Sequence, residues 1–255
     1  MSPFAPDPVG SADAIRLPPP ALMRPAALTT VSLSRAARLL AEADHDLAAI
    51  LERHGPPPLW ARRPGFTSLL RIILEQQVSL ASARSTFERI RGRVSPFTAQ
   101  GLAALGQRGL RSLGVTRQKA SYCRGLAREI VTGGFEIGRL SRLDDDTARA
   151  ALTAIRGVGP WTADIYLLMA LRRADVWPAG DLALAAAARE IKHLRRSPSP
   201  ERLARLAEAW RPYRSVAARM LWQHYLAERA AKSGARRRAT DRRGDEATGR
   251  EKIGA

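Results

Sequence analysis

Apolar residues recur every three or four positions along most of this 255-residue chain, which is the spacing of one helix face. The pattern predicts a first helix capped by Ser34 and stopped by Gly55, and a second stripe from Phe66 to Leu74. Further helices are predicted at 79–93, 98–105, 107–113, 116–131, 183–194, 200–210 and from 212 onward. Asp145 or Asp146 begins another helix, and Pro160, at a first-turn position, begins the next. No segment alternates with period two, so the predicted fold class is all-α.

The stretch from Leu152 to Asp181 carries the clearest chemical signal. It places the turn Gly157-Val158-Gly159 between two helical patterns, with Asp181 about twenty residues later at the start of an Ala-rich helix. Glycine permits a positive φ and a close approach of a ligand, and helix N-termini bind phosphate groups. A phosphate-binding turn followed by a single carboxylate indicates an enzyme that acts on DNA.

The segment Ile155–Ala163, IRGVGPWTA, resembles the hairpin of the helix-hairpin-helix DNA glycosylase superfamily. Within that superfamily the chain resembles the 3-methyladenine DNA glycosylase II branch. Further similarity lies at 72–79, 113–130 and 211–222, and the resemblance covers about residues 57–228. It implies two helical lobes with an interlobe active-site cleft.

The resemblance also implies a division of the chain. One lobe, 60–175, is continuous and ends in the helix-hairpin-helix, and the other combines 31–59 with 176–230 and carries the catalytic Asp. Three consecutive prolines indicate that 1–30 is a flexible arm. The segment 231–255 has no apolar period and many arginines, so we predict a disordered basic tail.

The family's catalytic carboxylate corresponds to Asp181. Alkylation at N3 or N7 makes a purine cationic and a good leaving group, and the sugar then passes through an oxocarbenium-like state. A carboxylate stabilises that cation and orients the attacking water. The residue alone leaves another interpretation open, because an Asp before an Ala-rich helix also serves as a plain N-cap.

The resemblance predicts that Trp161, Trp222 and Ile165 line the base pocket. Family members that also cut the backbone carry a lysine at the position of Trp161, which forms a Schiff base with the sugar. We therefore predict a monofunctional enzyme. Two indoles suit a cationic purine through cation–π attraction, while Ile165 replaces a pocket aromatic. Core packing is the alternative role for either tryptophan.

Gln76 and Gln77 correspond to the loop that probes the duplex, with Gln77 at the position of the wedge that fills the vacated stack. Thr162 and Arg214 are predicted to contact DNA, and Lys119 is a weaker candidate for a phosphate contact. For Gln77 the alternative is a polar helix end at the surface.

The hairpin residues Gly157–Gly159 are predicted DNA contacts, and the resemblance implies a cation site beside them. Backbone carbonyls of Thr153, Ile155 and Val158 would hold Na⁺ or K⁺. No cofactor is expected to be required. Cys123 is the only cysteine, which excludes an iron–sulfur cluster with four Cys ligands and any internal disulfide.

The formal net charge of +18 fits a polyanionic partner, here damaged double-stranded DNA bound by a monomer. No apolar run approaches a bilayer span and the N-terminus has no secretory pattern, so a cytoplasmic, intracellular location is expected, with no membrane partner.

The predicted function is hydrolytic excision of alkylated purines, of the 3-methyladenine and 7-methylguanine type, which leaves an abasic site. One alternative is a glycosylase for deaminated or oxidised bases. The other is a non-catalytic helix-hairpin-helix protein that only binds DNA.

Overall fold

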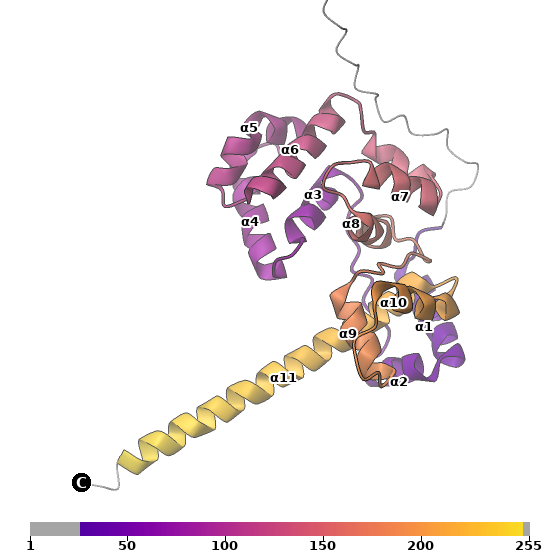
Figure 1. Cartoon of the computed structure of the whole chain (residues 1–255), viewed down its shortest axis with the longest axis vertical. Coiled ribbons are helices and arrows are strands. Elements are labelled where there is room, and N and C mark those ends of the chain that lie inside the picture. The colour runs from indigo at the N-terminus through magenta and orange to yellow at the C-terminus, as the bar shows by residue number, and fades with distance from the viewer. Residues whose placement is uncertain (1–25, 252–255) are drawn as a thin grey trace, which may run out of the picture. The chain divides into compact units, whose positions relative to one another are not determined.

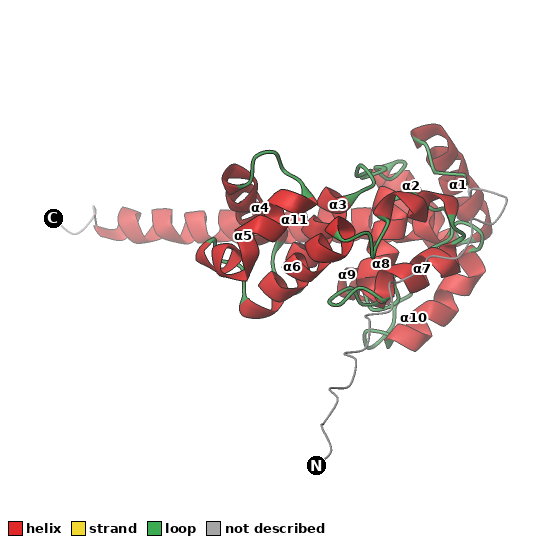
Figure 2. Ribbon diagram, turned by 90° about the horizontal axis from the view of Figure 1, so that it is seen from above, coloured by secondary structure: helices red, strands yellow, loops and turns green. Residues whose placement is uncertain are grey.

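The computed structural model describes the backbone of residues 26–251 and the side chains of residues 26–234. The helices, shown in Figures 1 and 2, are α1 (Thr30–Ala43), α2 (His45–His54), α3 (Phe66–Glu75), α4 (Leu80–Arg93), α5 (Ala99–Ser112), α6 (Arg117–Val131), η1 (Ile137–Arg142), α7 (Asp145–Thr153), α8 (Pro160–Ile165), η2 (Tyr166–Ala170), α9 (Leu182–Ile191), α10 (Pro200–Ala207), η3 (Glu208–Trp210) and α11 (Arg214–Glu251). No β-strand occurs between residues 26 and 251, so the all-α prediction is confirmed.

The chain divides into two compact units. The described part of the first unit is Arg62–Leu171, and the second combines Ala26–Ala61 with the chain from Arg172 onward. The N–H of Leu28 donates to the carbonyl of Arg172 at 2.8 Å, and the Leu28 side chain is buried. The predicted flexible arm 1–30 is therefore too long at its C-terminal end, and residues 1–25 lie outside the described residues.

Helix α3 is the central helix of the first unit, and it packs against α4, α6, α8 and η2. Its predicted apolar stripe is buried from Leu69 to Leu74, while Phe66 is half-buried, and Ile72 outside the stripe is buried as well. Helices α5 and α6 lie side by side (Figures 1 and 2), with Leu110, Ala120 and Leu126 fully buried. Each Å² of apolar surface that is buried in this packing contributes about 25 cal/mol to the free energy of unfolding.

In the second unit, α11 packs against α9, α2 and α1. The predicted single helix before Gly55 is two helices, which is a correction. The first is capped by Thr29 rather than Ser34, and the chain breaks at Asp44, whose carboxylate accepts the N–H of Asp46 at 3.0 Å. A residue far away in the sequence stabilises the break, because the Trp210 indole donates to the same carboxylate at 2.8 Å.

Helix α11 continues to Glu251, whereas the sequence analysis predicted disorder from 231. The segment 231–251 contains no proline, and its four alanines and six arginines are good helix formers that outnumber its three glycines. Once α11 has been nucleated by packing, each added residue extends it at little cost. Residues 252–255 lie outside the described part. No described helix is both long and apolar enough to cross a bilayer.

Candidate functional site

The hairpin turn, Ala154–Gly159, joins α7 to α8 in the first unit. Helix α7 begins at Asp145, in line with the prediction, and its N-cap is Asp144; Pro160 is the first residue of α8 as predicted. Gly157 has φ +89°, and a Cβ built on it would lie 2.2 Å from Cγ of Tyr122 on α6. Both the backbone conformation and the packing therefore require glycine at position 157.

At Gly159, neither the backbone conformation nor the packing requires glycine. Its φ of −84° and ψ of 176° suit any residue, and a Cβ there would meet no atom within 4 Å. Gly159 is the N-cap of α8, and no side chain there caps the helix. The open space beside this backbone is what a bound phosphate would need for close approach.

The wedge turn, Gln76–Ser79, follows α3. The Gln76 amide donates to the carbonyl of Gly157 at 2.9 Å and to Oγ1 of Thr162 at 2.8 Å. Thr162 is 2% exposed, so its hydroxyl faces Gln76. Gln77 is exposed and has φ +55°, in the left-handed region. The geometry gives Gln76 and Thr162 a role in joining the two turns, and their predicted DNA contacts stay predictions.

Lys119 on α6 is directed at the wedge turn. Its ammonium donates to the carbonyls of Leu74 at 2.7 Å and Gln76 at 2.6 Å. Burial holds the pKa of Lys119 below its ordinary value. The sequence suggested a phosphate contact for this side chain, and no local pattern could indicate its actual partners, which are backbone atoms more than forty residues earlier.

Asp181 is the N-cap of α9 in the second unit. Its Oδ1 accepts the N–H groups of Ala183 and Leu184, each at 2.9 Å, and the indole N–H of Trp222 at 3.2 Å. The N-cap interpretation of Asp181 is confirmed as geometry. It does not compete with catalysis, because the same hydrogen bonds fix the orientation of a carboxylate that could stabilise an oxocarbenium ion.

Trp222, which donates to this carboxylate, packs against a second tryptophan of the second unit. The Trp222 and Trp60 rings are 6.4 Å apart between centroids, at an interplanar angle of 64°. Trp60 has φ +46°, a costly conformation for a bulky residue and one that clusters at functional sites. The contact of Trp60 with Trp222 joins residues 162 positions apart in the sequence, and no local pattern indicates such a contact.

A buried arginine supports the backbone next to Trp60. The Nε of Arg219 donates to the carbonyl of Leu59 at 3.0 Å, and Nη1 donates to the carbonyl of Ser215 at 2.9 Å. Burial lowers the pKa of Arg219 to about 10. The sequence analysis missed this residue, because an arginine within the pattern of α11 has no local sign of burial.

The other predicted pocket residues belong to the first unit. Trp161 on α8 is half-buried, and Ile165 is 3% exposed. Tyr166, the neighbouring aromatic, is fully buried and accepts the N–H of Gly65 at 2.8 Å. Burial raises the pKa of Tyr166 to about 12. The roles of Trp161 and Ile165 in base binding stay predictions.

Arg214 is already engaged within the second unit. Its guanidinium binds the carboxylate of Asp175 at 2.9 and 3.1 Å, and that of Glu208 at 2.9 Å. These two ion pairs occupy the donors that a phosphate would need. The predicted DNA contact of Arg214 stays a prediction, without support from this geometry.

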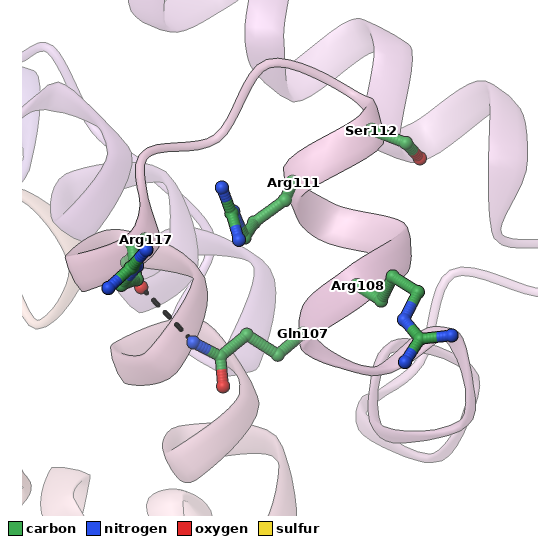
Figure 3. A pocket seen from close by; sticks show the side chains of 5 residues that line it. All are labelled: Gln107, Arg108, Arg111, Ser112 and Arg117. Carbon is green, nitrogen blue, oxygen red and sulfur yellow. Dashed lines mark hydrogen bonds between the residues drawn. The ribbon is translucent and has the colours of Figure 1, made fainter.

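A basic hollow of about 540 Å³ lies where α5 meets the start of α6 (Figure 3). Its lining residues are Gln107, Arg108, Arg111, Ser112 and Arg117. The three arginines are exposed, no carboxylate lines the hollow, and the Gln107 amide donates to the Arg117 carbonyl at 3.4 Å. This surface adds positive charge to the first unit.

The carbonyls predicted to hold a monovalent cation lie at the end of α7 and in the hairpin turn. Carbonyl oxygen is a ligand for Na⁺ and K⁺, and the carbonyl of Ile155 also accepts the N–H of Val158 at 3.0 Å. The donor chemistry therefore fits. Among the described residues there is no cluster of three or more His, Cys, Asp or Glu side chains that could hold a metal ion.

A profile described as "HhH-GPD superfamily base excision DNA repair protein" matches residues 70–212, which is more than half of the chain. The match includes the wedge turn, the hairpin turn and Asp181.

Individual relatives are similar over most of the chain. A Bacillus subtilis protein provisionally named a DNA-3-methyladenine glycosylase is 29% identical over 188 residues, 69% of this chain, and this chain spans 64% of that protein. A structure of a Bacillus halodurans DNA-3-methyladenine glycosidase is 28% identical, with a TM-score of 0.66, over 76% of this chain and 91% of that one. A Schizosaccharomyces pombe 3-methyladenine DNA glycosylase bound to abasic DNA shares the fold, with 23% identity and a TM-score of 0.66 over 74% of this chain and 95% of that one.

Proposed function

Because this chain belongs to the HhH-GPD superfamily of base excision DNA repair proteins, we propose that it is a monofunctional DNA glycosylase for alkylated purines. The observation that carries the proposal is Asp181. Its carboxylate receives two backbone N–H groups and the Trp222 indole at the start of α9, downstream of the hairpin turn. Relatives named for 3-methyladenine excision support the substrate class.

In the proposed reaction, the bond between C1′ and the purine nitrogen breaks, and its electron pair leaves with the base. Positive charge then develops on the sugar, where the Asp181 carboxylate stabilises it. A water oxygen bonds to C1′, and its proton passes to the carboxylate or to the departing base. The three donors on Oδ1 hold this side chain in one orientation, so little reorganisation is needed during the reaction.

The first unit supplies the proposed grip on the duplex. The hairpin turn binds a phosphate through backbone N–H groups, with close approach at Gly159. Exposed Gln77 fills the space that the flipped base leaves in the stack. Phosphate contacts position the enzyme without reading the base sequence. We therefore expect the same contacts with damaged and undamaged duplexes.

The product and the substrate range follow from the indoles. Trp161 stands where backbone-cutting relatives carry a lysine, and an indole cannot form a Schiff base, so the product is an intact strand with an abasic site. Trp222 donates to Asp181 and packs against Trp60, and aromatic rings of this kind suit a cationic purine. The proposed partner is damaged double-stranded DNA, bound by a monomer.

A structural Na⁺ or K⁺ belongs to the same proposal. The carbonyls of Thr153, Ile155 and Val158 would hold it, and it would stabilise the hairpin turn and add positive charge near the bound phosphate. No catalytic cofactor is proposed.

A panel of lesion-bearing duplexes tests this function. Each duplex carries one 3-methyladenine, 7-methylguanine, hypoxanthine, uracil or 8-oxoguanine, and released bases and strand breaks are measured. We expect release of the two methylated purines from unbroken strands. Release of deaminated or oxidised bases instead would favour the other glycosylase class. Tight duplex binding without release of any base would identify a non-catalytic DNA-binding protein.

A further inference from the structure

The wedge turn is fixed to the first unit from three sides. At the end of α3, the Glu75 carboxylate pairs with the Arg62 guanidinium at 2.9 and 3.1 Å. The Gln76 amide reaches the hairpin turn at the Gly157 carbonyl and Thr162, and the Lys119 ammonium binds the carbonyls of Leu74 and Gln76. Only the tip of the turn, which begins at Gln77, is exposed.

Lys119 makes two charge-assisted hydrogen bonds to this turn. Its two acceptors are carbonyls at the C-terminal end of α3, where the helix dipole concentrates negative charge. Hydrogen bonds from an ammonium are about twice as strong as those between neutral groups. None of the ion pairs found among the described residues involves Lys119, so its charge is directed at this backbone. Burial lowers its pKa, as expected for an ammonium removed from solvent.

The conformation of the tip explains why such support is needed. Gln77 has φ +55°, a region that residues other than glycine seldom occupy. Backbone in such a conformation persists only when the surrounding structure holds it there. Helix α6 provides that support, and it also carries Tyr122, whose ring lies against Gly157 of the hairpin turn.

We propose that Lys119 is a positioning residue for base flipping. Its ammonium fixes the wedge turn to the first unit, so that the Gln77 side chain enters the duplex in a defined position. Gln76 carries this position to the hairpin turn. The turn that binds a phosphate and the turn that fills the stack then move as one rigid piece. This inference rests on the proposed glycosylase function and adds to it a residue that touches neither the DNA nor the reacting atoms.

Flipping is measured directly by stopped-flow fluorescence of 2-aminopurine placed next to the lesion in a duplex. The Lys119→Met variant keeps the unbranched apolar part of the side chain and removes the ammonium. We expect it to slow flipping about 10-fold, which corresponds to about 1.4 kcal/mol of barrier. Gln77→Ala should also slow flipping, and the double variant should be no slower than Gln77→Ala, because Lys119 acts only through the wedge.

A second variant and a control complete the design. Gln76→Met cuts the link to the hairpin turn while leaving the ammonium in place, and it should also slow flipping. If Lys119→Met does not fold, parental flipping by Gln76→Met would overturn the proposal that the two turns move as one piece. Lys192→Met removes another partly buried ammonium, which binds Asp44 and Asp46 in the second unit. It should lower thermal stability and leave the flipping rate unchanged.

Each outcome of the cycle is decisive. Parental flipping by Lys119→Met, parental flipping by Gln77→Ala, or effects of the two that add in full would overturn the positioning role. Fluorescence does not depend on base release, so a chain that flips but excises nothing would contradict the proposed function alone.

Discussion

The two glycines of the hairpin turn should respond differently to substitution by alanine. Alanine at 157 must adopt φ +89°, which costs about 1–2 kcal/mol, and its Cβ would lie 2.2 Å from the Tyr122 ring. Displacing a packed ring adds about 1–3 kcal/mol. Gly157→Ala should therefore destabilise the protein by about 2–5 kcal/mol and lower Tm by on the order of 10 °C.

Gly159→Ala is the matched variant, because φ is −84° and a Cβ there would meet no protein atom within 4 Å. Its Tm should match that of the parent. Its affinity for duplex DNA should nevertheless fall for damaged and undamaged duplexes alike, because the added methyl group occupies the space proposed for a phosphate.

Thermal unfolding and fluorescence anisotropy with a labelled duplex measure the two effects separately. The reasoning is refuted if Gly157→Ala unfolds at the parental temperature. It is equally refuted if Gly159→Ala binds duplex DNA as tightly as the parent, since the open space at Gly159 would then have no part in binding.

Three further predictions concern the thiol, an acidic cap and the monofunctional assignment. Burial raises the pKa of Cys123 to about 12, so the folded protein should not react with a thiol reagent at pH 8, and reaction should follow unfolding. Burial opposes ionisation of Asp44, but hydrogen bonds from Trp210 and Lys192 outweigh it and hold its pKa below 3.8. Its stabilising effect should be complete above about pH 4 and vanish as pH falls through the lowered pKa, so parent and Asp44→Asn should converge in acid unfolding. Borohydride should trap no covalent complex with DNA, and a trapped complex would contradict the role given to Trp161.

Local patterns predicted the parts of the structure that local interactions decide. The helices at 66–75 and 117–131, the capping role of Ser79 and the start of α8 at Pro160 follow from periodicity and helix-end preferences. The hairpin turn was recognisable from its glycines, because a positive φ at Gly157 leaves a direct mark on the sequence.

What the sequence analysis missed depends on contacts between distant residues. The break at Asp44 is stabilised by Trp210, and Lys119 binds backbone carbonyls of α3 rather than an anion. Gln76 resembles an exposed polar helix end, yet its amide is bound to the hairpin turn. In each case the residue type permits several partners, and only the fold selects one.

The central claim is that Asp181 is catalytic as well as a helix cap, and Asp44 provides the control. Asp44 is also an N-cap whose carboxylate accepts an indole N–H, but it lies outside the proposed site. Asparagine keeps the capping ability at both positions. Single-turnover release of 7-methylguanine from a duplex should fall at least ~100-fold in Asp181→Asn, with Tm preserved, because the charge that stabilises the transition state is lost. Asp44→Asn should lose stability and retain the parental rate. Release by Asp181→Asn at near the parental rate would contradict the account.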